Sequence, residues 1–192
     1  GTMGLIFILV CAIMTSVSIV REKEVGTMEV LLVSPVRPAK IVFAKMVPYF
    51  VISCVVLIMI LLLAYFMLHV PISGGVWGIF TLSLLYLLLS LSLGLLVSTV
   101  AKTQTAALLI SGMVMMIPIL LLSGMLFPIE NMPKFFEVLS NIVPARWYID
   151  AIRKMMIQGV PLMAVWKDCV ILLGMTIALL GMSLINFNDK LE

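Results

Sequence analysis

Residues 21–45, REKEVGTMEVLLVSPVRPAKIVFAK, form the only long polar interruption of the chain before residue 128. They hold five of its twelve Lys and Arg residues and three of its nine acidic residues. On a helical wheel, one arc of about 120° carries the apolar Val25, Met28, Leu31 and Leu32, while Val30 and Val33 fall on the polar side. Pro35 then disfavours helical backbone at the residue before it. We therefore predict a short amphipathic helix over residues 21–35.

The composition of the whole chain indicates a membrane protein. Its 192 residues are 64% hydrophobic and 11% charged, with a mean hydropathy of +1.29, whereas a soluble domain has about 25% charged residues. A soluble fold of this length cannot bury so much apolar surface, so the solvent must be a lipid bilayer. The net charge of +3 is small and gives no reason to expect a nucleic-acid partner.

Five apolar stretches are long enough to cross a bilayer, which requires roughly 20 residues each. They cover residues 4–20, 46–68, 76–100, 106–127 and 169–187. Pro48 is expected in the first turn of the second span, where its missing N–H costs little, and Pro118 is expected to kink the fourth. The fold class predicted is therefore all-α: a polytopic integral membrane protein with five transmembrane helices.

The basic residues near the span ends predict the orientation. With residues 21–45 in the cytoplasm, seven lie on that side: Arg21, Lys23, Arg37, Lys40, Lys45, Lys102 and Lys190. Five lie on the other: Lys134, Arg146, Arg153, Lys154 and Lys167. Tryptophans at positions 77, 147 and 166 fall at the predicted outer interface, in agreement. The helix at 21–35 then lies on the cytoplasmic membrane surface or docks on a protein there, unless it is a solvated connector between two spans.

Residues 128–163 are too charged to span, although aromatic and aliphatic residues recur there at helical spacing. Pro133 and Pro144 are expected to start two short helices. Such a pair can dip into the outer leaflet and return if protein surrounds its backbone, and we expect Trp147 and Tyr148 to anchor it at the interface. Two interpretations stay open: a passive cap on the bundle, or a gate over an exit path.

The spans offer little chemistry. None carries an acidic or basic residue at its centre. The spans therefore lack the ionisable side chains that a proton relay or an ion-coupled carrier needs. Ser90, Gly94 and Ser98 repeat every four residues on the third span, a pattern that permits close helix packing within the chain or across a dimer face. No lysine follows a glycine, which excludes a Walker A loop. We therefore expect no catalytic residue, metal site or cofactor in this chain.

Two long motifs carry a family resemblance. SIVREKEVGTMEVLLVSPVRPAKIVFAK, residues 18–45, is followed by LLSGMLFPIENMPKFFEVLSNIVPARWYIDAIRKMMIQG, residues 121–159. Together they resemble the permease subunit of an ABC-2 type exporter, in particular its bacterial multidrug-type branch. The resemblance implies six spans per subunit, so we expect a further span and an outer domain upstream. It also implies a dimer of permeases in the bacterial cytoplasmic membrane, with two separate ATPase subunits that hold ATP and Mg.

The same resemblance implies roles for both polar segments. Residues 21–35 would be the coupling helix that contacts the ATPase, through Arg21, Glu22, Glu24, Gly26, Thr27, Glu29 and Pro35. Residues 128–163 would be a re-entrant outer hairpin, with Pro128, Pro133, Pro144, Arg146, Trp147 and Tyr148 as its candidate gate residues. We expect the three glutamates to face a groove of the partner, and Gly26, in mid-helix, to let a partner backbone approach.

The function expected is that of a permease that moves an apolar or amphipathic, drug-like substrate outward, driven by a separate ATPase. Two alternatives stay open: a permease for lipid or polysaccharide export, and a non-transporting membrane scaffold or channel.

Overall fold

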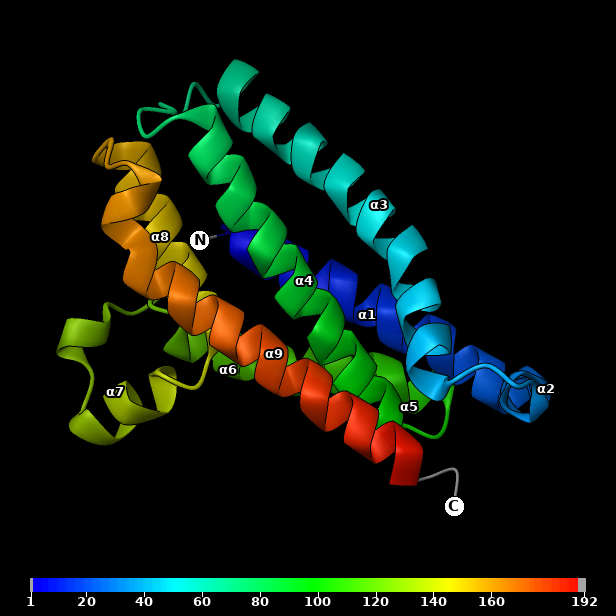
Figure 1. Ribbon diagram of the computed structural model, residues 1–192. Coiled ribbons are helices and arrows are strands. Elements are labelled where there is room, and N and C mark those ends of the chain that lie inside the picture. Colours follow the sequence, from blue (N-terminus) through cyan, green and yellow to red (C-terminus); the bar gives the residue numbers. More distant parts are fainter. Residues whose placement is uncertain (1, 190–192) are drawn as a thin grey trace.

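A computed structural model describes residues 2–189, which form a bundle of helices without a strand among them (Figure 1). The long helices are α1 (Thr2–Val25), α3 (Pro38–Phe66), α4 (Val76–Val100) and α9 (Trp166–Asp189). The shorter segments are α2 (Thr27–Val33), α5 (Gln104–Leu109), η1 (Ile110–Val114), α6 (Met115–Leu122), η2 (Ile129–Asn131), α7 (Lys134–Ser140), α8 (Pro144–Ile157) and η3 (Leu162–Val165). Lys190, counted above among the cytoplasmic charges, lies outside the described residues.

Five stretches of helix are long and apolar enough to cross a membrane, so the prediction of an all-α chain with five spans is confirmed. They cover Thr2–Val25, Ala39–Phe66, Val76–Val100, Gln104–Leu122 and Leu162–Phe187.

The expected place of Pro48 in the first turn of the second span is wrong. Pro38 occupies that turn, directly after the N-cap Arg37, and Pro48 lies well inside α3. The fixed φ of proline suits a first helical turn, so Pro38 starts this helix eight residues before the predicted boundary.

The fourth span is built from three consecutive helical segments. A π-helical segment, η1, separates α5 from α6, and Pro118 lies inside α6. Ser111 of η1 is buried, and its hydroxyl lies 2.9 Å from the hydroxyl of Ser16 on α1. The helix ends at Leu122 and Gly124 follows with a φ of 79°, so the predicted end at residue 127 is five residues too far along the chain.

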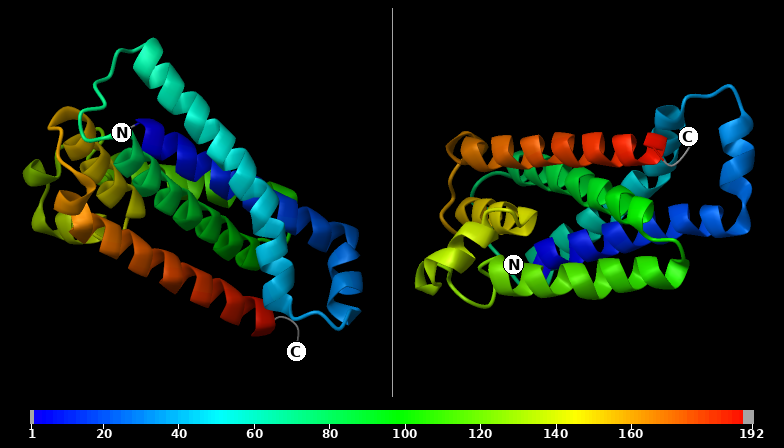
Figure 2. Two further views of the ribbon diagram at one scale, coloured as in Figure 1. Left: turned by 45° about the horizontal axis from the view of Figure 1, so that its top comes forward. Right: turned by 90° about the horizontal axis from the view of Figure 1, so that it is seen from below.

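Helix α4 packs between α1 and α9 and forms the centre of the bundle (Figure 2). The small-residue stripe of α4 is buried. A Cβ atom added to Gly94 would lie 2.7 Å from Cβ of Thr15 and 3.0 Å from the carbonyl oxygen of Ala12, both on α1. The Ser90 and Ser98 hydroxyls donate to carbonyl oxygens of α4 itself, at 2.8 and 2.5 Å. The stripe therefore brings the α1 and α4 backbones together within one chain.

The short segments gather at the two ends of the bundle (Figure 2). One end holds α2, the turn at residues 101–103 and the C-terminal end of α9. The other holds the start of α1, the loop at residues 67–75 and the pair α7–α8. This arrangement groups the two polar segments of the sequence at opposite ends, as five consecutive spans require.

The α1–α4 contact makes the stability of the bundle sensitive to residue 94. Gly94→Leu should lower the free energy of unfolding by about 1–3 kcal/mol or more, because overpacking a tight contact forces backbone shifts. Thermal unfolding of the purified protein in detergent measures the effect. Gly181→Leu on α9 is the matched control, since a Cβ atom there meets no heavy atom within 4 Å. An equal and small loss in both variants would show that α1 and α4 do not approach closely at Gly94.

Candidate functional site

The polar stretch at residues 21–45 folds as a corner between two helices. Arg21–Val25 is the last turn of α1, and α2 begins at Thr27. Gly26 joins them with a φ of 83°, a left-handed conformation that glycine adopts without steric cost. The prediction of one helix over residues 21–35 with Gly26 in its middle is therefore wrong. A Cβ atom on Gly26 would meet nothing within 4 Å, so the described residues explain this glycine by its backbone conformation.

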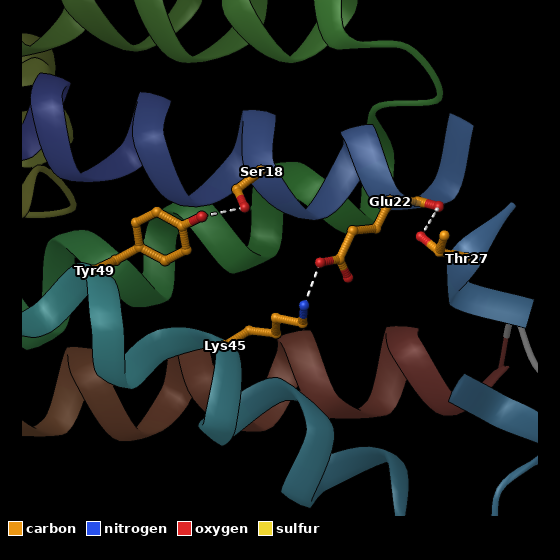
Figure 3. Close-up of polar contacts among 5 residues, drawn as sticks. All are labelled: Ser18, Glu22, Thr27, Lys45 and Tyr49. Atoms are coloured by element: carbon orange, nitrogen blue, oxygen red, sulfur yellow. Dashed lines mark hydrogen bonds and ion pairs between the residues drawn. The ribbon is translucent and has the colours of Figure 1, made fainter. Parts of the chain in front are cut away.

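A network of side chains fixes the corner to the neighbouring helix α3 (Figure 3). Lys45 of α3 donates to Oε1 of Glu22 in a partly buried ion pair. One turn away, the hydroxyl of Tyr49 on α3 donates to the hydroxyl of Ser18 on α1. The Thr27 hydroxyl donates to the Glu22 carbonyl oxygen at 3.2 Å and so satisfies an acceptor that the end of α1 leaves open. Together these bonds hold α1, α2 and α3 in fixed positions relative to one another.

The end of α1 also bonds to the turn between α4 and α5. The Glu24 carboxylate accepts from the backbone N–H of Gln104, at 3.2 Å, and from its side-chain amide, at 2.7 Å. A carboxylate at a helix N-terminus is stabilised by the unpaired N–H groups and the helix dipole, so Glu24 caps α5. Lys23 donates to the Ser98 carbonyl oxygen at 2.5 Å and lies 5.9 Å from the centre of the Phe187 ring on α9.

These contacts correct the roles predicted for the glutamates. Glu22 and Glu24 lie on α1 and bond within the chain, while Glu29 lies on α2 and is exposed. The three therefore do not share one surface helix that faces a partner. Arg21 and Pro35 are exposed.

Sequence reasoning missed Lys45, Tyr49 and Gln104 as partners of this segment. One signal was present: Ser18–Glu22 and Lys45–Tyr49 each have the i, i+4 spacing that puts two residues on one helix face.

Three apolar side chains of the corner and of α2 are largely exposed. Val25, Val30 and Val33 are 68%, 73% and 86% exposed. Val30 and Val33, three residues apart, share a helix face, the face that we predicted to be polar. The side chains of Met28, Leu31 and Leu32, which formed the predicted apolar arc, lie outside the part of the structure that is described. Val30 and Val33 give α2 an apolar surface that α1 and α3 do not cover.

At the opposite end, Arg146 and Trp147 fasten the turn between α7 and α8. Nη1 of Arg146 donates to the Ser140 hydroxyl and to the Asn141 side-chain carbonyl, both at 2.5 Å. Nε1 of Trp147 donates to the Asn141 backbone carbonyl at 3.1 Å. Pro133 is the N-cap of α7, and Pro144 occupies the first turn of α8. Pro128 precedes the turn η2. The proposed gate prolines thus all mark starts of helical segments.

The interfacial place predicted for Tyr148 is wrong, because its side chain is fully buried in the bundle. Its ring stacks on that of Tyr86 from α4, with centroids 4.1 Å apart and planes 3° from parallel. Its hydroxyl lies 2.9 Å from the hydroxyl of Ser83, and the Tyr86 hydroxyl donates to the Gly4 carbonyl oxygen of α1 at 2.8 Å. Consecutive helical residues point about 100° apart, so Trp147 can sit at the surface while Tyr148 faces the core.

The chain matches the family described as ABC-2 family transporter protein over residues 1–185. It is 28% identical to the probable multidrug ABC transporter permease YbhS of Escherichia coli K12, over the whole of this chain and 51% of that protein. It is 33% identical to the probable multidrug ABC transporter permease YbhR of the same organism, over 81% of this chain and 42% of the relative. It is also 32% identical to ABC transporter G family member 20 of Dictyostelium discoideum, over 92% of this chain and 24% of the relative.

The chain spans about half the length of the first of these relatives. No solved structure shows significant similarity to it. The bacterial relatives are named as permeases. Since the family match extends over nearly all of its residues, this chain belongs to the ABC-2 family of transporter proteins.

Proposed function

We propose that the chain is the membrane-spanning part of an exporter permease, driven by a separate ATPase that docks on the α1–α2 corner. The observation that carries the proposal is the way the corner is bonded. Glu22 holds α3 through Lys45, and Glu24 holds α5 through Gln104. A push on α2 therefore reaches three spans through direct contacts, and the exposed valines offer the ATPase an apolar surface.

In this proposal, ATP binding closes two partner ATPases and presses them against the corners of two permease copies. The spans then shift between inward-open and outward-open arrangements. Such a shift is a change in the populations of two states, and it can be only as large as the difference in partner affinity between them. ATP and Mg belong to the ATPase, and the bacterial cytoplasmic membrane is the proposed location.

An apolar or amphipathic cargo suits the surfaces that the chain offers. A cavity of about 510 Å³ opens at the outer end, and it is lined mainly by apolar side chains of α1, α3 and α8. The names of the relatives YbhS and YbhR point to drug-like molecules as candidate substrates. Export of such molecules is the direction that we propose.

The pair α7–α8 is proposed to be re-entrant and to line the exit. Tyr86, the partner of Tyr148, lies ten residues into α4, which corresponds to about 15 Å along the helix axis. This depth is about half of a hydrocarbon core of roughly 30 Å. One face of α8 is buried against α1, α4 and α9, so the protein surrounds that face of the helix at this depth.

The proposed orientation predicts a labelling pattern. On a background without the three native cysteines, a cysteine at Lys134 should react in intact cells with a reagent that cannot cross the membrane. A cysteine at Thr27 should react only after the cells are opened. Both positions are exposed, so burial does not protect either one. Labelling at Thr27 but not at Lys134 in intact cells would reverse the orientation.

Docking of the ATPase on the corner predicts a loss of binding when α2 becomes charged. Val33→Asp should lower copurification of the ATPase about tenfold or more, because a buried unpaired charge costs several kcal/mol. Val76→Asp, also at an exposed valine but at the opposite end of the molecule, is the matched control. Equal ATPase recovery with both variants would place the docking surface elsewhere.

The link between α1 and α3 predicts that a charge swap restores coupling. Glu22→Lys and Lys45→Glu should each lower transport per ATP hydrolysed, since each puts two like charges where an ion pair stood. A partly exposed pair is worth about 1 kcal/mol or less, so the protein should still fold and bind the ATPase. The double variant Glu22→Lys/Lys45→Glu should recover most of the transport. A double variant as impaired as the single ones would show that the pair does not transmit the motion.

A further inference from the structure

Two cavities meet beside the short turn η2, between α6 and the pair α7–α8. The larger, of about 580 Å³, is lined mainly by apolar side chains, among them Ile117, Leu121 and Phe136. The smaller, of about 290 Å³, is mainly polar. Pro128 lines both cavities. The turn η2 lies between them, since Asn131 faces the apolar cavity while Ile129 and Glu130 line the polar one.

Charges of both signs line the polar cavity: Glu130, Arg146, Asp150 and Arg153. Two of them are already engaged. Arg146 bonds to Ser140 and Asn141, and Asp150 pairs with Lys154 at 2.7 Å. The bond to Asp150 also raises the pKa of Lys154. Among the side chains that the structure describes, neither Arg153 nor Glu130 has a hydrogen-bond or ion-pair partner.

A third polar group in this cavity lacks a partner. Ser123 lines it and is 2% exposed, and its hydroxyl has no hydrogen-bond partner among the described residues. Leaving a buried hydroxyl unsatisfied costs free energy. The following Gly124 has a φ of 79° and turns the chain away from α6, so the end of the fourth span contributes to the polar cavity.

We propose that these two cavities bind one phospholipid whose head group is zwitterionic and carries a primary ammonium, as in phosphatidylethanolamine. The phosphate lies against Arg153, and the ammonium lies against Glu130. An acyl chain passes Pro128 and lies along Ile117, Leu121 and Phe136. The site holds whether or not this chain acts as an exporter, because it depends only on the geometry of the outer end.

The charge pattern favours this class of lipid over an anionic one. Basic pockets between transmembrane helices bind anionic head groups, and a cavity for such a lipid would carry an excess of positive charge. Here Asp150 is paired with Lys154, and Arg146 bonds to Ser140 and Asn141. One basic side chain, Arg153, and one acidic side chain, Glu130, remain for a ligand. An apolar cavity with a few convergent polar groups is the usual form of a small-molecule site, at roughly 300–1,000 Å³. The two volumes fall near or within this range.

Native mass spectrometry of the delipidated, purified protein tests the proposal. The probes are long-chain phosphatidylethanolamine, long-chain phosphatidylglycerol and a short-chain phosphatidylethanolamine, each titrated separately. The wild-type protein should bind the long-chain phosphatidylethanolamine about tenfold more tightly than phosphatidylglycerol, because a charge-assisted bond to Glu130 is lost in the second lipid. The short-chain lipid should bind more weakly than the long-chain one.

Variants test which residue binds the ammonium and which binds the phosphate of the head group. Glu130→Gln should abolish the preference for phosphatidylethanolamine, and Arg153→Gln should weaken both long-chain lipids about tenfold. Lys134→Gln and Glu137→Gln, exposed charges of α7 that line neither cavity, should leave binding unchanged. Three results overturn the proposal. They are tighter binding of phosphatidylglycerol than of phosphatidylethanolamine, equal lipid binding in all variants, and no lipid binding because a second copy of the chain covers the two cavities.

Discussion

The close approach of the α1 and α4 backbones at Gly94 is the contact on which the rest of the bundle depends. The gap that a side chain would need is filled by Thr15 and Ala12 of α1. In a bilayer the surrounding lipid is as apolar as the helix surfaces, so helix association relies on close packing of small residues. Because α4 also packs on α8 and α9, the α1–α4 pair sets the positions at which the other elements find their contacts.

The same solvent explains how polar groups are distributed. Inside the spans, several hydroxyls bond on their own helix: those of Ser90, Ser92 and Thr176 donate to carbonyl oxygens one turn earlier. Charged groups gather at the two ends of the bundle, where water and head groups are available. Among the described residues, charged contacts between helices lie at two places. One is the α1–α2 corner, and the other is the pair α7–α8, where Nζ of Lys154 also lies 4.0 Å from Oδ2 of Asp168 on α9. These are also the two segments that stand out in the sequence.

Apolar run lengths and proline positions were enough to predict an all-helical chain with five spans, because a bilayer allows few other structures. The corner was harder to predict. Gly26 is compatible with the middle of a helix at a cost of about 1 kcal/mol, and only the three-dimensional course of the chain shows that it ends one. The bonding partners of Glu22 and Glu24 were equally hard to predict, because their bonds to Lys45 and Gln104 depend on how helices distant in sequence pack. Tyr148 was misplaced because it follows Trp147, which is partly exposed, whereas its own side of α8 faces the core.

Helix α1 connects the two polar ends physically. Its 24 residues extend about 36 Å at 1.5 Å per residue, without a break between the corner and the end that packs on α8. At its first turn the Gly4 carbonyl accepts from Tyr86, and a Cβ atom on Gly4 would lie 3.0 Å from the Tyr148 ring. An axial shift of α1 at the corner must therefore either carry α4 and α8 with it or break the contact between Gly4 and the two tyrosines. Since interdigitated cores deform little, movement of the three helices as one body is the less costly response.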